Sequence, residues 1–390
     1  MIQKVRSVNE FRAATSDVLI IGGGLIGLSI AWHLADHGIH AVVLERDTVG
    51  SGASGAAAGL LTPVTASGRF GHMVDFGIES LRYYSDFLSS VREESQQEIE
   101  LQTAGLMRIA LDNGAEAMLS KFDKWPHAKS LEMVWLSASE SLSIAPYISP
   151  EVRGAVISPL ERQVNPRTLL ECLRKSCMKR GVAIIEHAQA RSISNVSVNG
   201  NKRAIRVRTD KGDYSFGALV IASGAWSADL GTTLGYPLPV RPIKGQVLTA
   251  LPCTTPHNVK FTVYGNHSYI IPGDDKALLL GSTNVNCGFD TRPTLKGITD
   301  LVASTAQLMP SILDSEFQHT WCGLRPATPD YFPILGRLPL WDNVYIATGH
   351  YKNGILLTPI TGKVIANEIY CGEVSPLIEK YRPDRFSSSN

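Results

Sequence analysis

Residues suited to binding a nucleotide cluster near the start of this chain of 390 residues. Gly22, Gly24 and Gly27 fit the pattern G-x-G-x-x-G, and Glu45 follows Gly27 by 18 positions. Such glycines permit a tight turn, a close approach of the backbone to a pyrophosphate and close helix–strand packing, while the acid accepts a hydrogen bond from a ribose hydroxyl. The N-terminus of the helix that follows also favours phosphate, because its unpaired N–H groups and positive dipole end attract an anion. The spacing predicts a dinucleotide, NAD or FAD; the alternative is a glycine-rich turn without a ligand.

Small residues follow at high density between Gly50 and Gly59. Without bulky side chains, this backbone can lie against a flat or large group. A flexible linker is the alternative, but residues 56–61 are too apolar for a solvated tether. We therefore expect the segment to contact a cofactor.

One arginine in the C-terminal part is a candidate ligand. Arg325 lies in the proline-punctuated segment Trp321–Asp330, which we interpret as a rigid loop. A guanidinium can bind a planar carboxylate through two parallel hydrogen bonds, which lysine cannot do. The alternative for Arg325 is a structural salt bridge.

The elements that must position these residues alternate between strands and helices. Strand, glycine turn and helix occur at 18–38, and the same order recurs at 217–226 and 344–369. The recurrence predicts one nucleotide-binding domain built from separate parts of the chain. Segments rich in strand residues lie between these parts, at 240–251 and 259–282.

The predicted fold class is therefore α/β. A discontinuous Rossmann-like dinucleotide-binding domain carries an inserted α+β substrate-binding domain dominated by a mixed or antiparallel sheet, and two domains suit the chain length. The boundaries that we assign are 15–90, 150–238 and 320–375 for the nucleotide-binding domain, 91–149 and 239–319 for the substrate-binding domain, and 1–14 and 376–390 for terminal tails.

Composition argues against several other classes of protein. The chain is 44% hydrophobic and 19% charged with a formal net charge of +1, which gives no electrostatic reason to expect nucleic acid or an anionic membrane as a partner. No apolar stretch is long enough to span a bilayer, and residues 1–16 lack the apolar core of a signal peptide. The six cysteines include no C-x-x-C pair, so we expect reduced thiols, a cytoplasmic location and no metal site.

Five ordered motifs resemble those of flavin-dependent amine oxidoreductases of the D-amino-acid oxidase type. The resemblance runs from about Asp17 to Cys371. It is most pronounced for the glycine oxidase branch associated with thiamine biosynthesis, which Asn266–Pro272 and Gly349–Leu357 resemble especially. The motifs are the glycine pattern, Gly55-Ala-Ala-Ala-Gly59, Ala222-Ser-Gly-Ala-Trp226, Gly323-Leu-Arg-Pro326 and Gly349-His-Tyr-Lys-Asn-Gly354.

The resemblance implies FAD rather than NAD, with the flavin ring between the two domains. Cys322 lies one residue from the position at which sarcosine oxidases attach flavin covalently, so we expect non-covalent FAD. The expected cofactor-binding residues are Gly22, Gly24, Leu25, Ile26, Gly27, Glu45, Arg46, Ser54, Ala58, Gly59, Leu60, Ala190, Ser223, Gly224, Trp226, Gly349, His350, Tyr351, Lys352, Asn353, Gly354 and Ile355.

The resemblance also implies a substrate site. Arg325 is similar to the arginine that pairs with the substrate carboxylate, Tyr269 to the active-site tyrosine beside it, and His267 lies close in sequence. From the residues alone, Tyr269 on a strand and His267 in a polar turn fit structural roles as well. Lys352, a fourth catalytic candidate, stands where glycine oxidases commonly carry arginine, and Asn284 stands where the family varies.

The activity implied is oxidation of glycine or a small amino acid or N-alkylglycine, such as sarcosine or D-alanine. Hydride transfer from the α-carbon to flavin gives an imine and then a 2-oxo acid with ammonia or an amine, while O2 becomes hydrogen peroxide; in the thiamine context the imine feeds thiazole formation. Two alternatives stay open: a D-amino-acid or proline-type dehydrogenase that reduces quinone or a protein, and a non-catalytic flavin-binding subunit. The relatives suggest a homo-oligomer, a dimer or tetramer.

Overall fold

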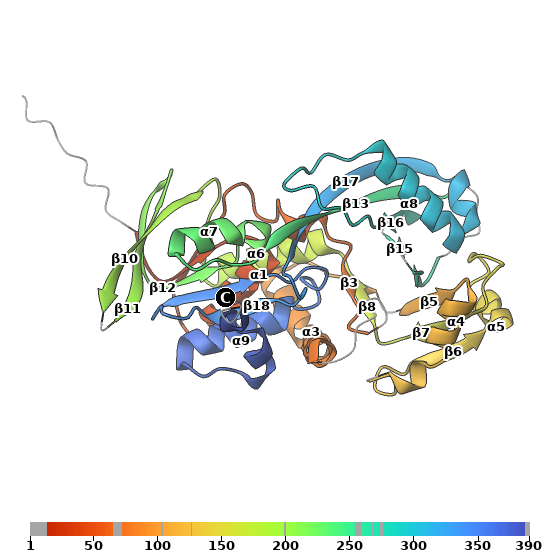
Figure 1. Ribbon diagram of the computed structural model, residues 1–390, viewed down its shortest axis with the longest axis horizontal. Coiled ribbons are helices and arrows are strands. Elements are labelled where there is room, and N and C mark those ends of the chain that lie inside the picture. Colours follow the sequence, from red (N-terminus) through yellow and green to blue (C-terminus); the bar gives the residue numbers. More distant parts are fainter. Residues whose placement is uncertain are drawn as a thin grey trace, which may run out of the picture.

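Two large sheets, each of eight strands within the described part of the chain, form the framework of this computed structural model. The structure describes residues 14–64, 72–102, 104–125, 127–198, 200–253, 259–266, 268–273 and 276–386. The site candidate His267 lies outside these residues. Figure 1 shows the first sheet towards one end of an elongated molecule and the second sheet towards the other.

The first sheet carries the glycine turn. Its strand order is β10–β11–β12–β1–β2–β9, with β19 paired to β12 and β18 to β19. Strands β9, β2, β1, β12 and β19 are parallel, as the repeated strand–glycine–helix order predicts. The bounds are β1 Ala14–Ile21, β2 Ala41–Leu44, β9 Ala183–Ile185, β10 Ala190–Val198, β11 Asn201–Thr209, β12 Gly212–Ile221, β18 Ile334–Arg337 and β19 Val344–Thr348.

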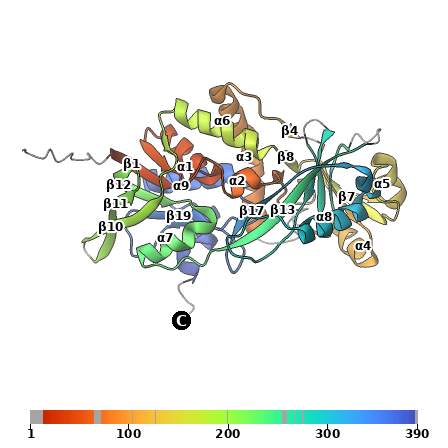
Figure 2. The ribbon, with the colours of Figure 1, turned by 90° about the horizontal axis from the view of Figure 1, so that it is seen from above.

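Both faces of β1 are buried, which explains its unbroken apolar run. Val18 and Ile20 belong to a core shared with helices α1, α3, α6 and α9, whereas Leu19 and Ile21 belong to a core shared with α7 and the strands β10 to β12. Figure 2 shows α6 and α7 on opposite sides of the sheet. The bounds are α1 Leu25–Asp36, α3 His72–Ser95, α6 Pro166–Lys179, α7 Ser227–Leu234 and α9 Thr358–Cys371.

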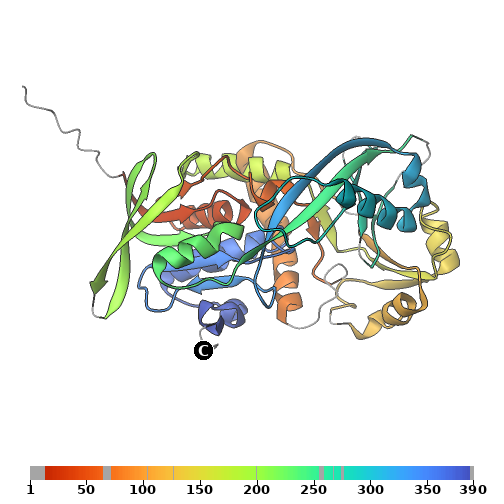
Figure 3. The same cartoon turned by 45° about the horizontal axis from the view of Figure 1, so that its top comes forward.

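The second sheet has the order β17–β13–β16–β15–β14–β5–β7–β6. Neighbouring strands are antiparallel except β14 and β5, which are parallel. Helix α8 packs on one face, where Leu301 and Leu308 join Leu248 and Leu280 in one core. Figure 3 shows β13 and β17 as a long pair that runs outward from the first sheet. The bounds are β5 Leu106–Ala110, β6 Val134–Ser137, β7 Gly154–Ser158, β13 Arg241–Leu251, β14 Thr262–Tyr264, β15 Tyr269–Pro272, β16 Leu278–Gly281, β17 Glu316–Ala327 and α8 Leu295–Leu308.

Short elements connect these layers. Strand β8 pairs with both β3 and β4 in a third sheet.

Among the described residues, no helix is long and apolar enough to cross a bilayer, and no group of His, Cys, Asp and Glu is arranged to hold a metal ion. The remaining bounds are β3 Leu60–Leu61, β4 Leu101–Gln102, β8 Arg162–Val164, α2 Ala53–Ala56, α4 Asn113–Leu119, α5 Ala138–Ile144, η1 Phe122–Lys124, η2 Gly224–Trp226, η4 Pro310–Asp314, η5 Pro376–Tyr381 and η6 Pro383–Phe386.

The strand β17 corrects the expectation of a rigid loop at 321–330. Arg325 lies on this strand opposite Ile243, because residues 316–327 form an antiparallel ladder with residues 241–251. Pro326, which lacks an N–H donor, is opposite Pro242, so the two prolines weaken the ladder at a single pair.

The sheets also divide the chain differently from the assigned domain boundaries. Strand β7 lies in the second sheet although 150–238 was assigned to the nucleotide-binding domain, and β17 continues that sheet past residue 320. Residues 376–386 are not a free tail, since Tyr381 is buried and Arg385 pairs with Asp330 at 2.9 Å. We propose that the domain boundaries follow the two sheets.

Candidate functional site

A cavity of about 580 Å³ extends from the glycine turn after β1 to the face of the second sheet that carries Arg325. Of the expected cofactor-binding residues, all line this cavity except Gly27 and Gly349. Tyr269 and Arg325 line it from the second sheet. The fold therefore brings the nucleotide and substrate candidates to a single cavity.

The glycine turn is shaped by contacts that exclude side chains. Gly22 has φ +122°, and a Cβ there would lie 2.3 Å from the backbone oxygen of Ala222. A Cβ on Gly27 would lie 2.0 Å from the oxygen of Gly22, so Gly27 serves helix packing rather than the cavity wall. Helix α1 begins directly after Gly24, and its first N–H, that of Leu25, donates to Ser54 Oγ at 3.0 Å.

The acid predicted for the ribose stands at the end of β2. Glu45 Oε2 accepts from the N–H of Gly23 at 2.8 Å, and Oε1 accepts from the N–H of Asp47 at 2.9 Å. Each carboxylate oxygen keeps a second acceptor position. Next to it, the Arg46 guanidinium lies 4.2 Å from the ring centre of Trp226, which also lines the cavity. These groups form a polar and aromatic end suited to a nucleoside.

The segment of small residues forms one side of the cavity. Residues 50–54 and 56–60 line it, and Gly59 has φ +85° with Val164 O only 1.9 Å from the place of a Cβ. Arg167 Nε donates to Gly55 O at 3.2 Å and fixes this backbone from α6. A Cβ on Gly323 would lie 2.7 Å from Ala56 Cβ, so the second sheet approaches this segment closely.

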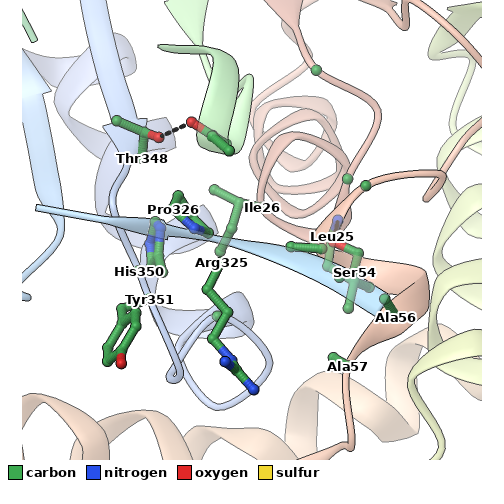
Figure 4. Close-up of a pocket in the computed structure, with 18 of the residues that line it drawn as sticks. Leu25, Ile26, Ser54, Ala56, Ala57, Arg325, Pro326, Thr348, His350 and Tyr351 are labelled. Atoms are coloured by element: carbon green, nitrogen blue, oxygen red, sulfur yellow. Dashed lines mark hydrogen bonds between the residues drawn. The ribbon is translucent and has the colours of Figure 1, made fainter. Parts of the chain in front are cut away.

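The loop between β19 and α9 forms the opposite side. Burial lowers the pKa of His350 to about 3, so its imidazole is neutral, and its Nε2 lies 3.2 Å from Thr361 Oγ1. Tyr351 has φ +49°, and its N–H donates to Pro326 O at 2.9 Å. Figure 4 shows Arg325 between this loop and the segment with Ala56 and Ala57.

The candidate carboxylate ligand is held in place by its neighbours. Arg325 Nη1 donates to Thr283 O at 3.0 Å, and Nη2 donates to Ser282 Oγ at 2.8 Å. A Cβ on Gly245 would lie 2.1 Å from Nη2, so the guanidinium lies directly over a glycine of β13. No counter-carboxylate within 4 Å of Arg325 occurs among the described residues. The structural salt bridge that is the alternative for Arg325 is therefore not formed within the described part of the chain, and two of its N–H groups donate to Ser282 and Thr283 instead.

Tyr269 is buried on the same face of the second sheet. Gly281 on the neighbouring strand β16 is paired with Tyr269, and a Cβ on this glycine would lie 2.3 Å from the tyrosine ring. Burial raises the pKa of Tyr269, and the nearby Arg325 and Ser282 offset this only in part. The phenol is therefore protonated near neutral pH and can donate a hydrogen bond to an anion.

Sequence reasoning missed residues that act through cross-strand pairing. Tyr264 lines the cavity, lies opposite Tyr269 and stacks on it with ring centres 5.8 Å apart. Gly245 and Ser282 also line the cavity, but neither was predicted. The sequence could have indicated Tyr264 if 262–272 had been interpreted as a β-hairpin. Residues that lie opposite each other in a hairpin point to the same face of the sheet, so Tyr264 would then share a face with Tyr269.

These residues fit a long dinucleotide cofactor. A Cβ on Gly22, Gly24 or Gly59 would crowd neighbouring protein atoms, so these glycines let the chain pack closely around the cavity, and α1 begins at the cavity wall. The cavity continues from this cradle to Tyr269 and Arg325, so the reactive end of a long cofactor would lie between the two sheets. Fold and site together define a dinucleotide-binding protein whose cavity lies between two sheets.

The chain belongs to the DAO family of FAD-dependent oxidoreductases, whose model matches residues 17–368. The cofactor is therefore FAD, as predicted. The chain is 33% identical over 355 residues to a glycine oxidase of Geobacillus kaustophilus, across 90% of this chain and 92% of that protein. It is 33% identical over 378 residues to the bifunctional protein ThiO/ThiG of Synechocystis sp., across 95% of this chain but 54% of that protein. The chain thus spans about half the length of this bifunctional relative.

Solved structures agree with the predicted fold class. The crystal structure of glycine oxidase from Geobacillus kaustophilus matches with a TM-score of 0.87 and 29% identity, across 96% of this chain and 99% of that one. The L-proline dehydrogenase from P. horikoshii matches with a TM-score of 0.85 and 20% identity, across 96% and 99%, which supports the fold alone. The predicted α/β class is confirmed.

The position of Cys322 predicts non-covalent FAD. On β17, Gly323 and Arg325 line the cavity, whereas alternation points Cys322 to the other face of the sheet. Burial also raises the pKa of the Cys322 thiol, which disfavours the thiolate needed for attachment. We expect acid denaturation to release all the flavin into the supernatant. Flavin that remains on the precipitated chain, detected as added mass, would contradict this.

Proposed function

We propose that this protein is an oxidase of glycine or of another small amino acid or N-alkylglycine, such as sarcosine or D-alanine. The observation that carries the proposal is the anchored guanidinium of Arg325 beside the protonated phenol of Tyr269, in the cavity that also contains the glycine cradle. The glycine oxidases among its relatives support this substrate class.

The proposal gives each of the two side chains a role. A guanidinium has five N–H donors; two of those on Arg325 are used by Ser282 and Thr283, which leaves others for a carboxylate. Tyr269 donates to the same carboxylate, so the substrate is held at one end and its α-carbon is oriented. FAD, when bound, supplies the two-electron oxidation of the C–N bond and the reduction of O2 to hydrogen peroxide. Hydrolysis of the imine then gives a 2-oxo acid and ammonia or an amine.

We extend the proposal to thiamine biosynthesis, in which a glycine imine would feed thiazole formation. The bifunctional ThiO/ThiG relatives support this role. His267 and Lys352 stay candidates for the substrate site, and Lys352 lines the cavity from the loop before α9. A cytoplasmic location and a homodimer or homotetramer remain predictions.

An anaerobic substrate panel tests the proposal. Glycine, sarcosine and D-alanine are added in turn to the oxidised holoprotein, and we expect at least one to bleach the flavin absorption. Admission of oxygen should then restore the spectrum and release hydrogen peroxide. Bleaching without peroxide would favour a dehydrogenase of D-amino acids or proline-type substrates, and no bleaching by any of the three would refute the proposal.

A further inference from the structure

Three consecutive residues after β16 connect the two sides of the substrate end. Ser282 Oγ and Thr283 O accept from Arg325, and Asn284 Oδ1 accepts from the Tyr351 hydroxyl at 3.0 Å. The segment Ser282–Asn284 therefore contacts both the anchored arginine on β17 and the loop between β19 and α9.

This segment is itself fixed to β13. Gln246 N–H donates to Thr283 Oγ1 at 2.8 Å, and Thr283 N–H donates to Gln246 O at 3.1 Å. Val285 and Lys244 exchange two further backbone hydrogen bonds at 2.8 and 2.9 Å. Because the backbone is held on both sides of Asn284, its side chain is a firm attachment point for Tyr351.

Tyr351 forms part of the cavity wall beside Arg325. Its ring centre lies 4.8 Å from that of Tyr331, and Lys352 Nζ lies 5.4 Å from the centre of the Tyr351 ring. All three of these residues line the cavity, whereas Asn284 is exposed and is not part of its wall. The side chain of Asn284 therefore acts on the cavity through the tyrosine whose hydroxyl it holds.

We propose that Asn284 is a positioning residue that limits substrate size: by holding the Tyr351 phenol, it keeps the cavity narrow beside Arg325 and favours carboxylates with small substituents. Without this acceptor, the Tyr351 ring is free to turn away from Arg325 and to admit bulkier groups. The inference deepens the proposed function, because it rests on Arg325 as the carboxylate ligand.

Binding of inert carboxylates to the oxidised holoprotein tests this inference. Acetate and phenylacetate carry no amino group, so each can be titrated through the flavin spectrum without turnover. We expect Asn284→Leu to lower the ratio of the phenylacetate Kd to the acetate Kd by about threefold to tenfold, the range expected for one hydrogen bond. Tyr351→Phe removes the same bond and should lower the ratio similarly. The double variant should change it no more than either single variant.

Asn286→Leu is the matched control, since Asn286 is also an exposed asparagine, two positions further along the chain, and its side chain shows no hydrogen bond among the described residues. An unchanged ratio in Asn284→Leu, additive effects in the double variant, or an equal change in Asn286→Leu would overturn the inference. So would a holoprotein that binds neither carboxylate. If the wild-type protein oxidises glycine but Asn284→Leu leaves the Kd ratio unchanged, the inference is refuted and the proposed function stands. If Asn284→Leu lowers the ratio but the wild-type protein oxidises no amino acid, the proposed function is refuted and the inference stands.

Discussion

Replacing Arg325 by alanine is expected to lower kcat/KM for glycine by a factor between about 30 and several thousand, equivalent to about 2–5 kcal/mol for truncating one partner of a hydrogen-bonded charge pair. The substrate carboxylate loses a partner that can donate two hydrogen bonds. Ser282 Oγ and Thr283 O lose the hydrogen bonds that Arg325 donates to them. The measurement is steady-state peroxide formation together with the rate of flavin reduction in a single anaerobic turnover.

Two further variants make this result specific. Arg325→Lys keeps the charge but not the planar fork, so it should recover only a small part of the lost activity. Arg292→Ala removes an arginine that is 87% exposed and pairs with Asp290, and it should leave kcat/KM unchanged. Wild-type kinetics in Arg325→Ala would remove Arg325 from the substrate site without affecting the family assignment.

Gly22→Ala is expected to give a protein that no longer retains FAD. A Cβ at this position would lie 2.3 Å from Ala222 O, and φ is +122°, which L side chains rarely adopt. Backbone strain of about 1–3 kcal/mol adds to about 1–3 kcal/mol for forcing the strand ends apart. The flavin-to-protein absorbance ratio after gel filtration measures retention, and thermal unfolding measures stability.

Gly212→Ala separates the two causes. Gly212 has a similar positive φ, +129°, but no heavy atom lies within 4 Å of an added Cβ. This variant bears the backbone strain without the collision, so it should keep its FAD and lose only part of the stability that Gly22→Ala loses. Equal loss of FAD in both variants would show that strain, and not the close approach to Ala222, is responsible.

Local sequence patterns were sufficient to predict the nucleotide-binding part of the site. The apolar run before Gly22, the G-x-G-x-x-G spacing and the acid at Glu45 predicted a dinucleotide cradle, because a strand, a tight turn and a helix each leave a short-range signature. The motifs around Arg325 and Gly349–Gly354 identified the flavin family, which the family match confirms. Gly22 and Gly24 line the cavity, whereas Gly27 packs its helix against the turn, because glycine is required where backbone meets backbone.

The substrate end of the cavity, by contrast, depends on contacts between segments that are distant in the chain. Arg325 lies on a strand and not in a loop, because its neighbours pair with residues 241–251, some 80 positions away. Tyr264 and Gly245 enter the site through cross-strand register, and Asn284 reaches Tyr351 from another segment altogether. Pairings of this kind join residues that are distant in the chain, and their energy comes from packing and hydrogen bonds that no local pattern records. The cradle is thus a local feature of the chain, while the pocket for the substrate is a property of the assembled sheets.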